Sequence, residues 1–184
     1  MSALVRPAVS AGLLLAAALA QSQGTLPASL KPPTDEVLRL SLYARGVQIY
    51  RCELPAPQSA QGRWVFQAPD ADLFADAAMT RLVGRHYDGP SWEALDHSRV
   101  TGKLRASEAG PDAAAIPWLL LGARSSGPED GMLAGIRSIQ RLDTVGGKPV
   151  KESCGSEQAG AVLRLPYTAV YHFWGGPSPA SQGR

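Results

Sequence analysis

The chain has 184 residues, enough for one domain with a sizeable core. It carries 18 Lys and Arg against 16 Asp and Glu, a formal net charge of +2, and the basic residues are spread singly. This balance gives no electrostatic reason to expect a nucleic acid or an anionic membrane as a partner. The 19 glycines and 15 prolines are spaced as short strands joined by turns require.

Residues 1–20 have the pattern of a secretory signal peptide. Arg6, the only charge in this segment, precedes an almost wholly apolar run that ends in the small residues Ala18 and Ala20. That run is too short for the roughly 20 apolar residues that a bilayer span needs. We therefore expect cleavage before Gln21 and a secreted or periplasmic chain that is not embedded in a membrane.

Cys52 and Cys154 are the only two cysteines. In an oxidising compartment an isolated pair forms a disulfide, and the alternatives are a redox pair or two metal thiolates. No C-x-x-C motif is present, and Cys52 stands inside a strand-like run. The sequence therefore favours a structural disulfide between them.

The apolar pattern over residues 35–174 predicts a single all-β domain, a sandwich or a barrel with little helix. Residues 21–34 are expected to form a flexible arm, and residues 175–184 a disordered tail. Cys154 falls in a polar loop, and one helical turn is expected around Leu73 and Phe74. Turns are predicted at 45–46, 89–90, 96–98 and 146–149. They separate about nine short strands, over residues 37–43, 47–52, 63–67, 80–87, 91–94, 99–105, 118–121, 136–142 and 167–174.

Period-two alternation assigns side chains to faces in two of these strands. In the second strand Gln48, Tyr50 and Cys52 share one face. In the last strand Tyr167, Ala169, Tyr171 and Phe173 share one face, and Thr168, Val170, His172 and Trp174 share the other. His172 is therefore expected to be a packed or half-exposed strand residue, not a ligand.

Six segments, in a fixed order, resemble the secreted bacterial and fungal proteins of domain-of-unknown-function family 3455. They are residues 46–52, 64–69, 84–93, 116–121, 139–147 and 166–171. The resemblance covers roughly residues 35–174 and implies family membership but no activity, because the family has none established. The family's usual Asp-Gly-Ser turn reads Asp96-His97-Ser98 here. That turn must either hold a non-glycine residue at positive φ or adopt another geometry.

Some relatives carry a malate dehydrogenase label, which this sequence does not support. Dinucleotide binding needs a Gly-x-Gly-x-x-Gly turn between a strand and a helix, and the chain has none. We expect no NAD and no other cofactor.

The densest set of reactive side chains lies between Arg85 and Lys103. We expect Tyr87, Trp92, Glu93 and Asp96 to form a binding surface for a carbohydrate, an envelope component or a small ligand, because aromatic faces stack on apolar or sugar surfaces and carboxylates accept hydrogen bonds. At least two of the four tryptophans should be core residues, and Trp92 is the one expected at a surface.

The alternative is a secreted hydrolase or a metal-dependent enzyme that uses the same hairpin. His86 and His97 could then meet across it as metal ligands or as an acid and a base. The chain has no His-x-His or His-Glu-x-x-His motif, and no Gly-x-Ser-x-Gly motif for a serine nucleophile. The sequence therefore favours binding without catalysis.

Overall fold

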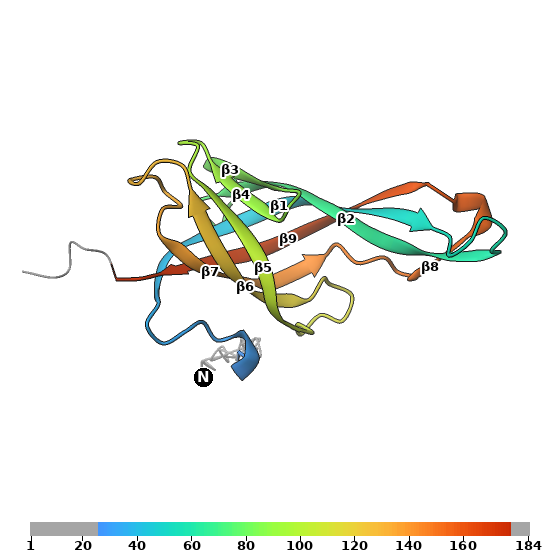
Figure 1. The fold of residues 1–184 in the computed structure, drawn as a ribbon, viewed down its shortest axis with the longest axis horizontal. Helices are drawn as coiled ribbons and strands as arrows, with labels where there is room; N and C mark the ends of the chain where they lie inside the picture. The colour runs from blue at the N-terminus through green and yellow to red at the C-terminus, as the bar shows by residue number, and fades with distance from the viewer. Residues whose placement is uncertain (1–25, 178–184) are drawn as a thin grey trace, which may run out of the picture.

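A computed structural model describes residues 26–177 as a closed, eight-stranded antiparallel barrel with one additional strand (Figure 1). The predicted signal peptide, residues 1–20, lies outside the described residues, as do residues 178–184 of the predicted tail. The strands pair in the order β1-β9-β7-β6-β5-β4-β3-β2, and β1 pairs with β2 to close the ring. Their bounds are β1 (Val37–Glu53), β2 (Gln61–Phe74), β3 (Leu82–Tyr87), β4 (Ser91–Ala94), β5 (Arg99–Glu108), β6 (Trp118–Ser126), β7 (Ile136–Gly146), β8 (Ser153–Gly155) and β9 (Val162–Gly175).

The predicted all-β class is confirmed, and of the two predicted architectures the chain adopts the barrel. Helix within residues 26–177 is limited to two short 3-10 turns, η1 (Ala28–Leu30) and η2 (Ser156–Gln158). Within the same residues, no helix is long and apolar enough to cross a bilayer.

The predicted turn at 45–46 is wrong, because β1 runs through it without a break. Gly46 pairs with Ala71 of β2 and Tyr167 of β9. A Cβ atom added at Gly46 would lie 2.2 Å from the carbonyl oxygen of Asp70. The glycine therefore allows a close approach of two strands and does not mark a reversal of the chain.

The predicted helical turn around Leu73 and Phe74 is also wrong. β2 continues to Phe74, and Leu73 and Ala71 are buried on the inner side of the barrel. Two Asp residues in this stretch suggest turns in the sequence, but Asp72 pairs in register with Arg45 and Arg85 of the two neighbouring strands. Strand pairing on both sides overrides the local turn preference.

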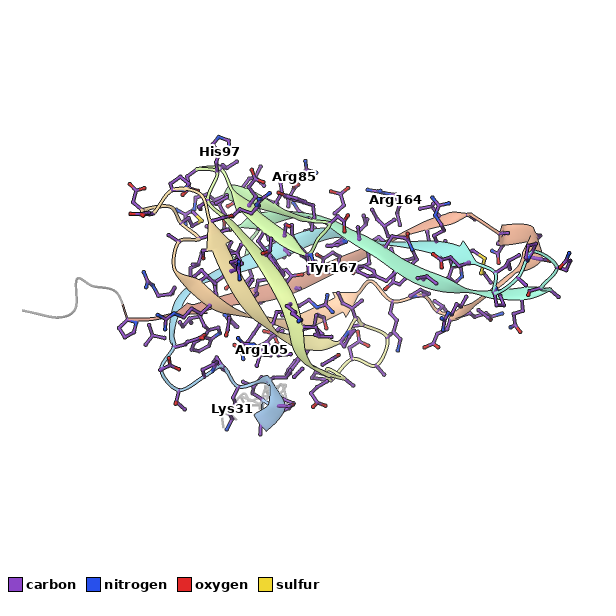
Figure 2. All side chains as sticks on the ribbon, in the orientation of Figure 1. Lys31, Arg85, His97, Arg105, Arg164 and Tyr167 are labelled. Atoms are coloured by element: carbon purple, nitrogen blue, oxygen red, sulfur yellow. A yellow bond between two sulfur atoms is a disulfide. The ribbon has the colours of Figure 1, made fainter. Side chains whose placement is uncertain are left out.

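The strands β1, β2 and β9 extend beyond the barrel as a twisted arm, and β8 pairs with β2 near the far end of this arm (Figure 1). Cys154 lies in β8, not in a loop, and forms the predicted disulfide with Cys52 of β1. The Cα atoms are 6.0 Å apart. The bond, yellow in Figure 2, therefore fixes the far end of the arm.

The main core fills the barrel. The predicted faces of β9 are confirmed, since all four residues from Tyr167 to Phe173 on one face are buried and His172 on the other is half-buried. A second apolar cluster lies outside the barrel wall, where Trp118 and Leu120 contact Leu30 of η1. Leu30, within the segment predicted as a flexible arm, is fully buried.

Candidate functional site

The β3–β4 hairpin carries three of the four predicted site residues, Tyr87, Trp92 and Glu93, and divides them between the two faces of the barrel wall. His86 pairs with Trp92, and Arg85 pairs with Glu93. Since side chains alternate along a strand, His86 and Trp92 point inward, whereas Tyr87 and Glu93 lie on the outer side. There the hydroxyl of Tyr87 donates a hydrogen bond to Glu93.

The expectation of Trp92 at a surface is wrong. Its exposed fraction is 1%, and its ring packs against Tyr171 and Phe173 of β9. The reason is register, because the turn before β4 places Trp92 opposite the inward-facing His86. The prediction of at least two core tryptophans is confirmed by Trp92 and Trp118.

Asp96 organises the turn between β4 and β5. One carboxylate oxygen accepts hydrogen bonds from the hydroxyl and the backbone N–H of Ser98, and the other accepts one from the N–H of Met132. These bonds, the Ser98 hydroxyl first, lower the pKa of Asp96. Asp96 therefore stabilises the turn through Ser98 and Met132, and it has no hydrogen bond to Tyr87 or Glu93.

His97 occupies the same turn at φ 65°, which confirms that the turn holds a non-glycine residue at positive φ. Its side chain points away from the barrel (Figure 2), 3.8 Å from a Glu93 carboxylate oxygen. His86, in contrast, lies inside. The barrel wall thus separates the two histidines, and nowhere in residues 26–177 do three or more His, Cys, Asp or Glu side chains gather as metal ligands.

A cavity of about 440 Å³ opens where the arm leaves the barrel. Its volume and mainly apolar walls are those of small-molecule sites. Two apolar side chains stand at its rim, Leu104 (57% exposed) and Phe66 (48% exposed). Buried residues from six different strands form its deeper part: Gln48, His86, Trp92, Leu121, Arg141 and Tyr171.

Two stacked rings form part of the cavity wall. The rings of His86 and Trp92 are nearly parallel, 9° apart, with centroids 4.2 Å apart, and Tyr171 meets both edge-on. Nδ1 of His86 lies 2.8 Å from the carbonyl oxygen of Ser91. Because a carbonyl can only accept, Nδ1 carries the proton and Nε2 is left as the acceptor.

His86 is uncharged at neutral pH. Its pKa is lowered to about 3, chiefly by burial; the hydrogen bond to Ser91 opposes this shift, and the positive charge of Arg141 adds to it. A ring held neutral and buried can accept a hydrogen bond from a ligand. It is a poor proton acceptor near pH 7, because a general base works best with a pKa near the working pH.

Arg141 is the buried charge of the cavity. It is 9% exposed, and its Nε and Nη2 groups donate to the carbonyl oxygen of Pro117 at 3.1 and 2.9 Å. Two further donors, Nε2 of Gln48 and Nε1 of Trp92, are buried and have no hydrogen-bond partner. Buried polar atoms usually have a hydrogen-bond partner, so these two unpaired donors are unusual.

Ser41 and His172 form a hydrogen-bonded pair on the outer side of the barrel, with Oγ and Nδ1 2.7 Å apart across β1 and β9. A serine nucleophile also needs a carboxylate that orients the histidine. Among residues 26–177 the ion pairs within 4.0 Å include only one histidine, His97. The Ser41–His172 pair is therefore a cross-strand contact, consistent with the predicted structural role of His172.

The sequence pointed to Trp92 but not to the cavity around it. Its faces for the second and last strands correctly grouped Gln48 with Tyr50, and Tyr171 with Phe173, on buried sides. Period-two alternation in these two strands was therefore the sequence signal that could have located the inward-facing residues Gln48 and Tyr171. Arg141 had no such signal, since its strand alternates imperfectly and the register of β7 against β9 shifts between Leu142 and Val145.

One family model matches the chain, over residues 32–175, and its description is "Protein of unknown function (DUF3455)". No curated protein matches. No solved structure matches either. The match spans the whole barrel and its arm, and includes every residue that lines the cavity. The chain therefore belongs to the DUF3455 family.

Proposed function

We propose that this protein is a secreted binding protein that holds a small, largely apolar ligand in the barrel cavity without transforming it. The observation that carries the proposal is the cavity itself, about 440 Å³ in volume, apolar along its walls and lined at depth by a few buried polar groups. Pre-formed pockets of this kind are the usual sites of small-molecule binding in proteins.

The position of Trp92 favours a small ligand over a carbohydrate on the hairpin surface. A sugar-stacking platform needs an exposed aromatic face, and the ring of Trp92 lies inside the barrel. On the outer side of the hairpin, Glu93 accepts a hydrogen bond from Tyr87. The cavity, in contrast, offers aromatic faces on residues from three strands.

Binding without catalysis is supported by the states of the acidic and basic groups. His86 has too low a pKa to act as a base near neutral pH. Glu93 and Asp96, the carboxylates that a hydrolase on this hairpin would use, are each engaged by side chains or backbone of the protein itself. Neither lines the cavity.

Secretion is supported by the predicted signal peptide together with the Cys52–Cys154 disulfide. Disulfides persist in oxidising compartments and are rare in the cytosol. The two features are independent, since one comes from the N-terminal sequence and the other from the folded domain.

The test uses N-phenyl-1-naphthylamine, a neutral apolar dye whose fluorescence rises in apolar surroundings. The mature protein should bind it in a saturable way. Leu104→Ser should weaken its binding about fivefold, because the variant removes part of the apolar rim and each buried methylene contributes about 0.8 kcal/mol.

The matched control is Leu95→Ser. Leu95 is 65% exposed, similar to Leu104, but it lies in the turn after β4 and does not line the cavity. This variant should bind the dye as the wild type does. Absence of saturable binding by the wild type, or equal weakening by both variants, would refute the proposed site.

A further inference from the structure

The deeper part of the cavity holds one positive charge with no negative partner among residues 26–177. Four ion pairs lie within 4.0 Å in this part of the chain, and none includes Arg141. Two of the five N–H donors of its guanidinium are used by the Pro117 carbonyl. A neutral carbonyl does not balance a buried positive charge, and buried charges are normally paired.

Two neutral donors beside the cavity are also unmatched. Nε2 of Gln48 and Nε1 of Trp92 are both buried without a partner, and both residues line the cavity together with Arg141. A buried donor without an acceptor costs about 1 to 3 kcal/mol. The three side chains come from β1, β4 and β7, so the excess of donors is a property of the assembled barrel and not of one turn.

The other buried polar groups of the cavity do not supply a negative charge. Burial raises the pKa of Tyr171, so its hydroxyl stays protonated. His86 is neutral and offers only the Nε2 acceptor. Asp88 and Lys103 are both exposed at the rim and carry opposite charges, and neither forms an ion pair with Arg141.

We propose that the ligand is a monocarboxylate with an apolar body, whose carboxylate lies against Arg141 and Gln48 and whose body occupies the apolar part of the cavity. One guanidinium balances one negative charge, and its planar fork matches the two oxygens of a carboxylate. The unpartnered amide donor of Gln48 supplies a further hydrogen bond. The inference rests on the proposed function, because it assumes that the cavity binds a small ligand.

The experiment displaces bound N-phenyl-1-naphthylamine with decanoate or with 1-decanol at pH 7.5. The two competitors share the same chain and differ in the charged head group. In the wild type, decanoate should displace the dye at a concentration at least tenfold lower than 1-decanol. In Arg141→Met this ratio should fall to about one, while the affinity for 1-decanol stays within about twofold.

Arg141→Met could fail to fold, because it leaves the Pro117 carbonyl without its donor. Gln48→Leu therefore serves as a second variant. It removes an unpartnered donor, keeps a similar volume and should lower the ratio about threefold. Arg137→Met is the matched control, since Arg137 lies in the same strand with an exposed side chain and does not line the cavity, and its ratio should equal that of the wild type.

The outcomes separate the two proposals. Dye binding with equal displacement by decanoate and 1-decanol refutes the carboxylate inference and leaves the binding function standing. A preference for decanoate that survives both Arg141→Met and Gln48→Leu also refutes the assigned head-group site. If the dye does not bind the wild type at all, the binding function fails and the carboxylate inference fails with it.

Discussion

At the scale of single residues, His86 shows how the barrel sets the chemistry of a side chain. The ring is 2% exposed, stacked on Trp92, and bonded through Nδ1 to a backbone carbonyl. The fold therefore has to hold it uncharged, first because burial disfavours the charged ring, and also because a proton would add a second positive charge close to Arg141. This requirement links His86 to the stability of the whole domain.

We expect the stability of the domain to fall as the pH drops from 6.5 to 4.5. Across this window the unfolded His86, with a pKa near 6.5, binds a proton that the folded state, with a pKa of about 3, does not bind. The unfolded state therefore binds more protons, and the free energy of unfolding decreases toward low pH by up to about 1.4 kcal/mol per pH unit. Urea unfolding curves at several pH values measure this slope.

His86→Gln should flatten this dependence, and His97→Gln should leave it unchanged, because the His97 side chain is exposed. A smaller slope should remain in His86→Gln, since burial also lowers the pKa of His172. An unchanged slope in His86→Gln, or a flattened one in His97→Gln, contradicts the assignment to His86.

At the scale of elements, the β3–β4 hairpin shows what the sequence could and could not predict. Its two strands and its turn were predicted, because alternation and the Gly89–Pro90 pair are local signals. Which of its side chains point inward depends on closure of the ring by β1 and β2, which no local pattern specifies. The predicted surface therefore combined Trp92, which is inside, with Glu93, which is outside.

The next turn along the chain provides a direct test of that division. Asp96→Ala removes the acceptor for Ser98 and for the N–H of Met132, and should lower the free energy of unfolding by about 1 to 2 kcal/mol. The affinity for N-phenyl-1-naphthylamine should not change, because Asp96 does not line the cavity. Thermal unfolding and dye titration measure the two effects.

Asp130→Ala is the control, since Asp130 is an exposed residue in the loop after β6 and its loss should affect neither quantity. Loss of dye binding in a folded Asp96→Ala variant would contradict the cavity as the binding site and would favour a site on the outer surface of the hairpin.

At the scale of the whole molecule, the cavity exists only because distant parts of the chain close the ring. Gln48 and Arg141 both line it, yet they are 93 residues apart in the sequence (141 − 48). Strand β1 contributes to the barrel with one half and to the arm with the other, so a single strand joins the cavity to the disulfide. A sequence pattern gives the inward face of each strand but not which faces meet, and for that reason the site required the structure.

Removal of the disulfide tests how far the arm supports the barrel. The bond closes a loop with a sequence separation of 102 residues, which contains β2 to β7. In the chain-entropy model such a loop contributes about 4 to 5 kcal/mol to the free energy of unfolding. The double variant Cys52→Ala, Cys154→Ala should therefore unfold at a clearly lower temperature.

The double variant should still bind N-phenyl-1-naphthylamine well below that temperature, because Cys52 lies four residues beyond Gln48, about 13 Å along β1. An unchanged unfolding temperature would contradict the entropic role of the bond. Lost dye binding in a folded double variant would show instead that the arm holds the cavity open.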